Sequence, residues 1–412
     1  EITKDSMPEV KRTWSVPTSP RSPYKLPDEL ELLSKFEGQE WSRETQRAFA
    51  RKLEESDFFE GSVYQQEPDF SARDRINRSP KTFGFVRFDD GNRIKITKAG
   101  EELISGRRKT ELFLKQLLKW QYPSPKHHGN RYQGFSVKPF LETLRLVYEL
   151  DGLSKKEIAV FCLPLTDFRN YNSTKMEILE FRKKLSQFKN IEKKRFVLTT
   201  HIEAYKKVYQ EELVSGAFRI RESRGKTSDE MHFISTKICN SLDYADSAIR
   251  YFRATGIFKL SATTFRLQVL DQKSDLVKEI LDNFSREPLP FEDETKFLDF
   301  LGNPDLPILP DNRPEVLQVE IIKLIEAISS KNLLAKDQLD AYRHERLVSA
   351  SVQQLRENRD KLEKILSDDL REIQKSALQS YSFYDDIIQM YDKIVNRADY
   401  DIPDKPLFFE WN

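Results

Sequence analysis

The chain has 412 residues, of which 38% are hydrophobic and 33% are charged, and its 68 Lys and Arg nearly balance 67 Asp and Glu. This length predicts about two to four domains, and the absence of a run of about eighteen apolar residues excludes a transmembrane helix. Residues 1–30 contain no apolar signal-peptide core, and the two cysteines, Cys162 and Cys239, have no metal-ligand spacing. We therefore expect a cytoplasmic protein with reduced thiols, no metal site and no membrane partner.

The near-neutral net charge hides a segregation of charge along the chain. Residues 73–131 contain 15 Lys and Arg against 6 Asp and Glu, whereas residues 313–412 contain 15 against 19. A local basic surplus is typical of a surface that follows phosphate groups. The sequence therefore predicts that residues 73–131 contact nucleic acid, and that the acidic terminal region packs against protein.

Residues 1–27 form a proline-rich arm without helical periodicity. We expect an extended segment whose most structured part is residues 19–23. Two placements are open for this arm: along a DNA groove, or as a strap over the surface of its own domain.

A pattern of a basic helix, a glycine and a short alternating β-ribbon follows, over Ser71–Ile104. A helix over residues 42–55 precedes it, and Asp89–Asn92 is a turn signal that joins the two strands into a hairpin. Thr97 is the expected N-cap of the next helix. This order of a helix and a hairpin predicts a winged helix, in which the helix fits the major groove and the hairpin touches phosphate.

The segment from Lys109 to Gly129 is expected to be helical until Pro123 stops it. Apolar side chains form one face, and Lys115 and Lys119 lie one turn apart on another. Two interpretations are open: an amphipathic connector, or a basic helix end that lies beside the duplex.

A second copy of the pattern spans Asp243–Leu270. It is preceded by an apolar-periodic helix over residues 137–150 and by a second helix that begins with a capping box, Ser154 and Glu157. Charged helices are expected over residues 178–213, and residues 219–226 are expected to be a flexible basic loop. Two copies in tandem indicate sequence-specific reading of DNA.

Residues 302–310 break the periodicity and predict an interdomain linker, and the chain beyond Pro314 is expected to be helical. A regular stripe of Leu355, Leu362, Leu366, Leu370 and Ile373 predicts one long helix that buries a single face. The expected fold is mainly α with small β-ribbons (α+β). Its expected domains are an arm and first winged-helix subdomain (1–135), a second winged-helix subdomain (136–300) and a helical linker domain (301–412).

Basic and polar side chains of these elements are the DNA-binding candidates, with base contacts on the two basic helices and phosphate contacts on wings and loops. The candidates are Arg21, Arg73, Arg75, Asn77, Arg78, Lys81, Arg87, Arg93, Lys95, Lys119, Lys126, Arg221, Arg224, Lys226, Arg250, Arg253 and Lys259. Solvated or ion-paired surface is the alternative for each, and we expect it for about half of them.

No catalytic site is predicted. Cleavage of DNA needs clustered carboxylates for Mg²⁺ and a nearby Lys, and only fragments of that arrangement occur. Pro68-Asp69 has no matching partner, Glu294-Thr-Lys296 lies in a polar helical stretch, and Pro304-Asp305 precedes Glu320 and Lys323 with a spacing that is one residue too long.

Several blocks, in order over roughly the first 310 residues, resemble the type IIS restriction and nicking endonucleases of the AlwI/BstNBI kind. They include Ser19-Pro-Arg-Ser-Pro23, Lys81-Thr-Phe-Gly-Phe-Val86, Arg250-Tyr-Phe-Arg-Ala-Thr-Gly-Ile-Phe258 and Gly302-Asn-Pro-Asp-Leu-Pro307. The most specific is Phe113-Leu-Lys-Gln-Leu-Leu-Lys-Trp-Gln-Tyr-Pro-Ser124. The resemblance is weak over the terminal helices.

The resemblance implies a modular enzyme in which a recognition domain with two winged-helix subdomains joins, through a helical linker domain, a Mg²⁺-dependent PD-(D/E)xK nuclease domain. Such enzymes bind a short asymmetric duplex site and cut a few base pairs to one side. The chain stops where that nuclease domain would begin, so we expect a monomeric recognition module without a cofactor of its own. The alternatives are a dimeric winged-helix transcription regulator that dimerises through residues 346–375 and, less favoured, an intact nuclease with an unrecognised carboxylate cluster.

Overall fold

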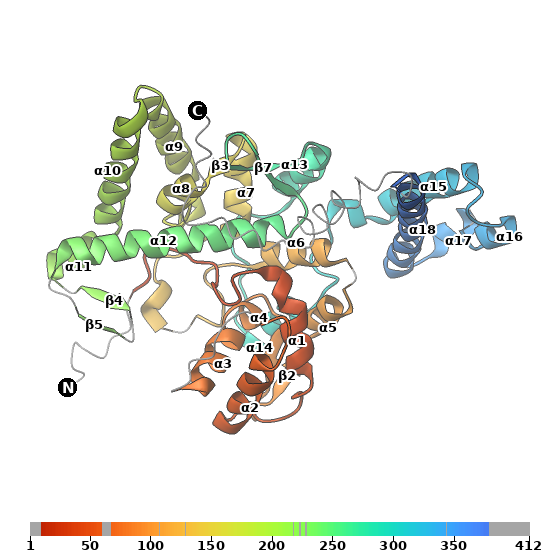
Figure 1. The fold of residues 1–412 in the computed structure, drawn as a ribbon, viewed down its shortest axis with the longest axis horizontal. Coiled ribbons are helices and arrows are strands. Elements are labelled where there is room, and N and C mark those ends of the chain that lie inside the picture. The colour runs from red at the N-terminus through yellow and green to blue at the C-terminus, as the bar shows by residue number, and fades with distance from the viewer. Residues whose placement is uncertain are drawn as a thin grey trace. The chain divides into compact units, whose positions relative to one another are not determined.

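A computed structural model of the chain describes residues 10–59, 67–106, 108–127, 129–216, 218–221, 224–226, 229–342 and 344–378. The chain divides into two compact units, Glu1–Pro307 and Ile308–Asn412 (Figure 1). Both are mainly helical, as expected, and the strands form three small antiparallel sheets in the first unit.

The helices of the first unit follow one another with short connections. They are α1 (Leu26–Ser34), α2 (Arg43–Glu54), α3 (Pro68–Asn77), α4 (Ser79–Thr82), α5 (Lys98–Ser105), α6 (Lys109–Lys119), α7 (Pro139–Glu149), α8 (Lys155–Glu157), the π-helical turn η4 (Ile158–Cys162), α9 (Tyr171–Leu185), α10 (Asn190–Val208), α11 (Gln210–Ser215), α12 (Glu230–Arg253), α13 (Ser274–Asn283) and α14 (Glu294–Leu301).

The strands pair in two hairpins and one three-stranded sheet, with the orders β1-β2, β4-β5 and β3-β7-β6. Their bounds are β1 (Val86–Phe88), β2 (Ile94–Ile96), β3 (Leu153–Ser154), β4 (Arg219–Arg221), β5 (Arg224–Lys226), β6 (Phe258–Leu260) and β7 (Arg266–Val269). The hairpin of β4 and β5 corrects the expectation of a flexible loop over residues 219–226, because Arg219 pairs with Lys226 and Arg221 with Arg224.

Side-chain caps start the helices where the sequence predicts them. Ser42 accepts a hydrogen bond from the backbone N–H of Thr45, and Thr97 accepts one from that of Gly100. Ser154 and Glu157 form the expected capping box. Each cap satisfies an N–H group that the first helical turn leaves without a partner, which fixes where the helix begins.

The two repeats share one order of elements. The first repeat has the order α1, the bridging residue Glu40, α2, α3, α4 and the β1-β2 hairpin. Glu40 bridges antiparallel to Arg93 beside β2. The second repeat has the order α7, β3, α8 with η4, α12 and the β6-β7 hairpin. Its strand β3 pairs antiparallel with β7. The subdivision into two winged-helix domains at residue 135 stays a prediction.

A glycine with a positive φ lies two residues before the first hairpin strand in both repeats. Gly84 has φ +74° before β1, and Gly256 has φ +70° before β6. A Cβ on Gly84 would lie 2.4 Å from the Cγ of Leu301 and 2.8 Å from its carbonyl oxygen. The left-handed backbone and the close approach of α14 both require glycine there.

The long helix α12 runs through the first unit and buries its C-terminal half (Figure 1). The arm of residues 10–23 covers it: Ser247 donates to the carbonyl of Pro17, and the Tyr251 hydroxyl contacts Pro20 and Ser79. The arm is therefore a strap over its own domain, which was one of the two placements expected for it.

The second unit begins near the expected linker and is helical. Its helices are α15 (Pro314–Ser330), α16 (Lys336–Leu339), α17 (His344–Ser349) and α18 (Val352–Leu378). Leu355 and Leu362 of α18 are buried against Leu317 and Ile321 of α15. Leu355, Leu362 and Leu366 of the predicted stripe thus pack within this unit, and the side chains of Leu370 and Ile373 lie outside the described residues.

Candidate nucleic-acid interface

Three arginines form a stripe along one side of α2. Arg43, Arg47 and Arg51 are spaced four residues apart, so they lie on the same face of the helix, and all three are exposed. Asp69 of α3 lies beside them, with an ion pair of 3.3 Å to Arg47 and a longer one of 3.9 Å to Arg43. This stripe was not among the sequence candidates, although its spacing of i, i+4 and i+8 was a readable signal.

Helix α3 adds Arg73 and Asn77 to the same face, because they follow Asp69 by four and eight residues. Both are exposed, and the guanidinium of Arg73 lies 5.4 Å from the ring centre of Phe70. We call these five side chains the basic face: Arg43, Arg47, Arg51, Arg73 and Asn77. A helix surface of this kind can offer guanidinium groups to phosphates and an amide to base edges.

The β1-β2 hairpin presents three further candidates. Arg87 pairs with Asp299 at 2.6 Å, Lys95 pairs with Asp89 at 3.6 Å, and Arg93 is exposed. Ion pairs at exposed positions contribute about 0–1 kcal/mol. A phosphate can therefore replace the carboxylate partner at little cost.

Arg21, Arg78 and Lys81 lie where the arm meets α3 and α4. Arg21 pairs with Asp243 at 3.2 Å, and Arg78 contacts both Asp74 and the Thr18 hydroxyl. The ammonium of Lys81 lies 5.2 Å from the ring centre of Phe88. All three remain at least partly exposed.

Arg75, expected to read bases, points into the protein instead. Its guanidinium nitrogen lies 2.5 Å from a carboxylate oxygen of Glu29, whose side chain is fully buried. Burial raises the pKa of Glu29, and the hydrogen bond and charge of Arg75 oppose that rise. The side chain of Arg75 therefore neutralises a buried charge and is not presented to DNA.

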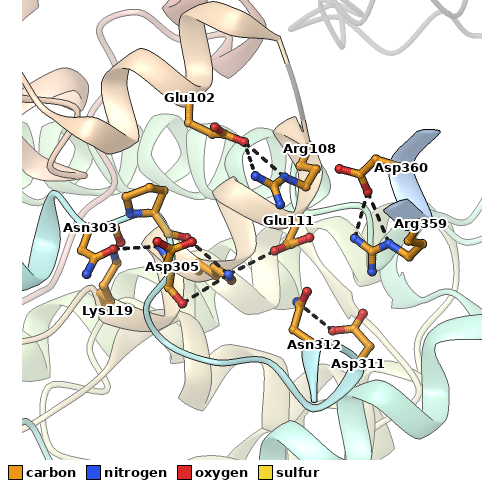
Figure 2. A network of polar contacts seen from close by, with 12 residues as sticks. Glu102, Arg108, Glu111, Lys119, Asn303, Asp305, Asp311, Asn312, Arg359 and Asp360 are labelled. Carbon is orange, nitrogen blue, oxygen red and sulfur yellow. Dashed lines mark hydrogen bonds and ion pairs between the residues drawn. The ribbon is translucent and has the colours of Figure 1, made fainter. Parts of the chain in front are cut away.

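Lys119 is also an internal residue. Its ammonium donates to the carbonyls of Phe300, Leu301 and Asn303 at 3.2, 2.9 and 2.8 Å, and Figure 2 shows it beside Asn303. Burial lowers the pKa of Lys119 well below its usual range, and the charge of Lys115 adds to this. Of the two interpretations for α6, the buried connector is therefore confirmed.

Two more candidates are engaged inside the fold. Lys126 donates to the carbonyl of Lys81, and burial lowers its pKa to about 7, assisted by the charge of Lys81. Arg250 is buried and pairs with Asp246 at 3.0 Å. The second repeat thus does not present the basic end of α12 as an open recognition helix, because the arm and neighbouring helices cover it.

The remaining candidates of the second repeat are Arg253, which is half-buried, and Lys259, which pairs with Asp271 at 3.0 Å. Lys259 occupies the strand position that Arg87 occupies in the first repeat, two residues into each hairpin. The side chains of Arg221, Arg224 and Lys226 lie outside the described residues, although their backbones pair as β4 and β5.

The acidic fragments considered for metal binding do not form a carboxylate cluster in the described part of the chain. Asp69 forms ion pairs with Arg43 and Arg47. Desolvation raises the pKa of Asp69, but a backbone hydrogen bond and Arg47 outweigh it, so the pKa lies below its ordinary value. Over the described part of the chain, no group of three His, Cys, Asp or Glu side chains could hold a metal ion. The same residues include no helix that is long and apolar enough to cross a membrane.

Comparisons with known proteins show the family. Among solved structures, the BpuJ1 endonuclease binding domain in complex with pyrene- and phenanthrene-modified DNA is similar, with a TM-score of 0.42 and 13% identity over 68% of this chain and 91% of that chain. No curated protein matches the chain. The sequence model of the AlwI restriction endonuclease family matches residues 81–412, which is more than half of the chain. This chain therefore belongs to the AlwI restriction endonuclease family.

Proposed function

We propose that this chain recognises a short asymmetric site in double-stranded DNA and directs a type IIS restriction or nicking activity to a position a few base pairs away. The observation that carries the proposal is the basic face in a member of a restriction endonuclease family. Its arginines are exposed, and the ribbon of the same repeat contacts the residues just before α2, where the rings of Trp41 and Phe88 stack.

The contacts follow from the chemistry of each element. In this proposal the first repeat is a winged helix, and α3 enters the major groove. Arg73 reads guanine and Asn77 reads adenine, the bases that their bidentate donors and acceptors match. The α2 stripe and the hairpin residues Arg93 and Lys95 neutralise phosphates on either side, which supplies affinity without sequence preference.

The second repeat has a smaller role in this proposal. The C-terminal half of α12 is buried, so Arg253 and Lys259 are the side chains that extend the contact from this repeat. Its hairpin then touches phosphate, while most base reading comes from the first repeat. We propose that binding involves one copy of the chain, because an asymmetric site does not repeat a half-site.

We also propose that strand cleavage depends on Mg²⁺ and uses carboxylates other than Asp69. Asp69 already balances the charges of Arg43 and Arg47, and a carboxylate in that position does not match the open carboxylate cluster that Mg²⁺ requires. The residues of the basic face bind and orient the duplex in this scheme.

Selection of bound sites from a random duplex pool tests the proposal. The expected result is one enriched asymmetric motif, bound with one chain per duplex in sedimentation equilibrium. Enrichment of a palindrome bound by two chains would favour the dimeric regulator instead. Failure to enrich any motif would overturn sequence-specific recognition.

A further inference from the structure

The second repeat contains a large insertion that the first repeat lacks. In the first repeat α2 is followed by α3 after residues 55–67, whereas in the second repeat residues 163–229 separate η4 from α12. Helices α9 and α10 of this insertion form an antiparallel hairpin that is closed at their connecting loop, with the other end of α10 against α12 and α9 against η4 (Figure 1). A hairpin held at its base offers its tip to a partner.

Aromatic stacking holds the two helices together close to the tip. The ring centres of Phe181 and Phe196 are 5.7 Å apart, and those of Phe188 and Phe196 are 4.9 Å apart, both in stacked geometry. Phe181 also contacts Phe161 of η4. Such contacts fix the tip as a preorganised surface, so little conformational entropy is lost on binding.

The tip carries a concentrated positive charge. Residues 183–195 contain six Lys and Arg against one acidic residue, Glu192. Lys189, Lys193 and Arg195 are exposed, and within the described part of the chain no carboxylate forms an ion pair with them. By contrast, Lys206 and Lys207 nearer the base of α10 pair with Glu230 and Glu177.

We propose that the tip of the α9-α10 hairpin binds the phosphate backbone of the duplex beside the recognised site. The inference rests on the proposed function, since it assumes that the basic face holds a duplex. Arg182, three residues before the end of α9, donates to the carbonyls of Leu150 and Gly152 and pairs with Glu157, so the tip begins about one helical turn beyond the anchored part of α9.

Charge favours a duplex over a protein partner at this tip. Lys184 pairs with Glu180 at 2.7 Å, and the cations of residues 183–195 still outnumber the carboxylates, which matches a polyanion. Ile191 is the large apolar side chain exposed within the cluster, at 62% of its surface. The other exposed apolar side chains of the two helices, Met176, Leu179 and Leu198, lie outside residues 183–195, so the charged tip itself has too little apolar area for the buried centre of a stable protein interface.

The test compares a tip variant, Lys189→Ala with Lys193→Ala and Arg195→Ala, with a control that removes the same charge elsewhere. The control is Lys35→Ala with Lys156→Ala and Lys278→Ala, three exposed lysines on separate elements. Each protein is titrated with the selected site in a short duplex and in duplexes extended by about twelve base pairs on one side or the other.

The tip variant is expected to bind one of the extended duplexes at least about tenfold more weakly than the unmodified chain, with a salt slope lower by about 2 to 3. On the short duplex its affinity and base preference should equal those of the unmodified chain, and its unfolding midpoint should not change. The control should keep the affinity of the unmodified chain for both extended duplexes.

Equal affinity of the tip variant and the unmodified chain for every duplex would overturn the inference, as would an equal loss on the short and extended duplexes. Binding of the unmodified chain to its selected site would still support the proposed function in either case. If the unmodified chain selects no site, the proposed function fails; weaker binding of the tip variant than of the control to a duplex of arbitrary sequence, with a lower salt slope, would still support the tip contact.

Discussion

Replacing Arg75 with Ala separates a structural role from a DNA-reading role. The change leaves the Glu29 carboxylate, which has no exposed surface, without the guanidinium that lies 2.5 Å from it. Removal of one partner from a buried pair costs about 3–5 kcal/mol of unfolding free energy. The Arg75 side chain is 19% exposed, so water enters the gap more readily, and we expect the lower end of that range, about 3 kcal/mol.

The loss should depend on pH in a defined direction. Burial already raises the pKa of Glu29 above its ordinary value of 4.5, and loss of Arg75 raises it further. A carboxyl group with a raised folded-state pKa stabilises the protein below its unfolded pKa, and that contribution is lost as pH rises through the folded pKa. The cost of Arg75→Ala should therefore be larger at pH 7 than near pH 4.5.

Urea unfolding followed by circular dichroism, at both pH values, measures this cost. Arg73→Ala is the matched control, since Arg73 lies two residues away and is exposed, and it should change the stability by less than about 0.5 kcal/mol. Adding Glu29→Gln to Arg75→Ala should recover part of the loss by removing the buried charge. An unchanged unfolding midpoint together with an altered base preference for Arg75→Ala would refute the structural role.

Four further predictions concern the basic face, Lys126 and the second unit. Arg47→Ala and Arg51→Ala should each weaken binding to all duplexes alike and flatten the salt slope by about 1, measured by fluorescence anisotropy; a change in base preference would contradict phosphate contact. Asn77→Ala should cost about 1–3 kcal/mol of binding free energy and relax preference at one base pair, measured by competition with single-base variants; a uniform loss would contradict base reading. The folded-state pKa of Lys126 is about 7 against an ordinary 10.5, so the unfolded chain binds more protons between these values and stability should rise with pH across this window. Lys126→Met should show a smaller rise between pH 7 and pH 9.5 in urea unfolding, and an identical rise would show that Lys126 is not responsible. Truncation after Pro307, at the boundary between the two units, should keep site preference and change affinity by less than about tenfold, or roughly 1.4 kcal/mol. A larger loss of affinity in a folded truncated protein would show that the second unit itself binds DNA.

Local sequence patterns predict the parts of the fold that depend on a few neighbouring residues. The caps at Ser42, Thr97 and Ser154 and the hairpin turn at Asp89–Asn92 lie where the sequence predicts them. Each is decided by hydrogen bonds within about four residues, so no knowledge of tertiary packing is needed.

Burial of charged residues could not be predicted in the same way. Arg75 and Glu29 are 46 residues apart, and the carbonyls that surround Lys119 are more than 180 residues away along the chain. In the sequence these side chains resemble solvated cations of a basic region. Their internal roles depend on which helices pack together, and that information is not local.

Other errors have simpler causes. The arginine stripe of α2 lies outside the basic helix next to the ribbon, on which the prediction of base contacts rests, although its four-residue spacing is visible in the sequence. Residues 219–226 have the basic, polar composition of a loop, yet Arg219 and Arg221 pair with Lys226 and Arg224 as strands. Backbone pairing between the two strands outweighed composition there.

Protection of arginines from chemical modification tests the central claim most directly. The chain is treated with phenylglyoxal with and without a duplex that carries the selected site, and modification is located by mass spectrometry. The account predicts that Arg43, Arg47, Arg51 and Arg73 are protected by the duplex. Arg169, whose side chain is 73% exposed and which belongs to neither α2 nor α3, should be modified equally in both samples. Equal modification of the four arginines with and without the duplex would contradict recognition through the basic face.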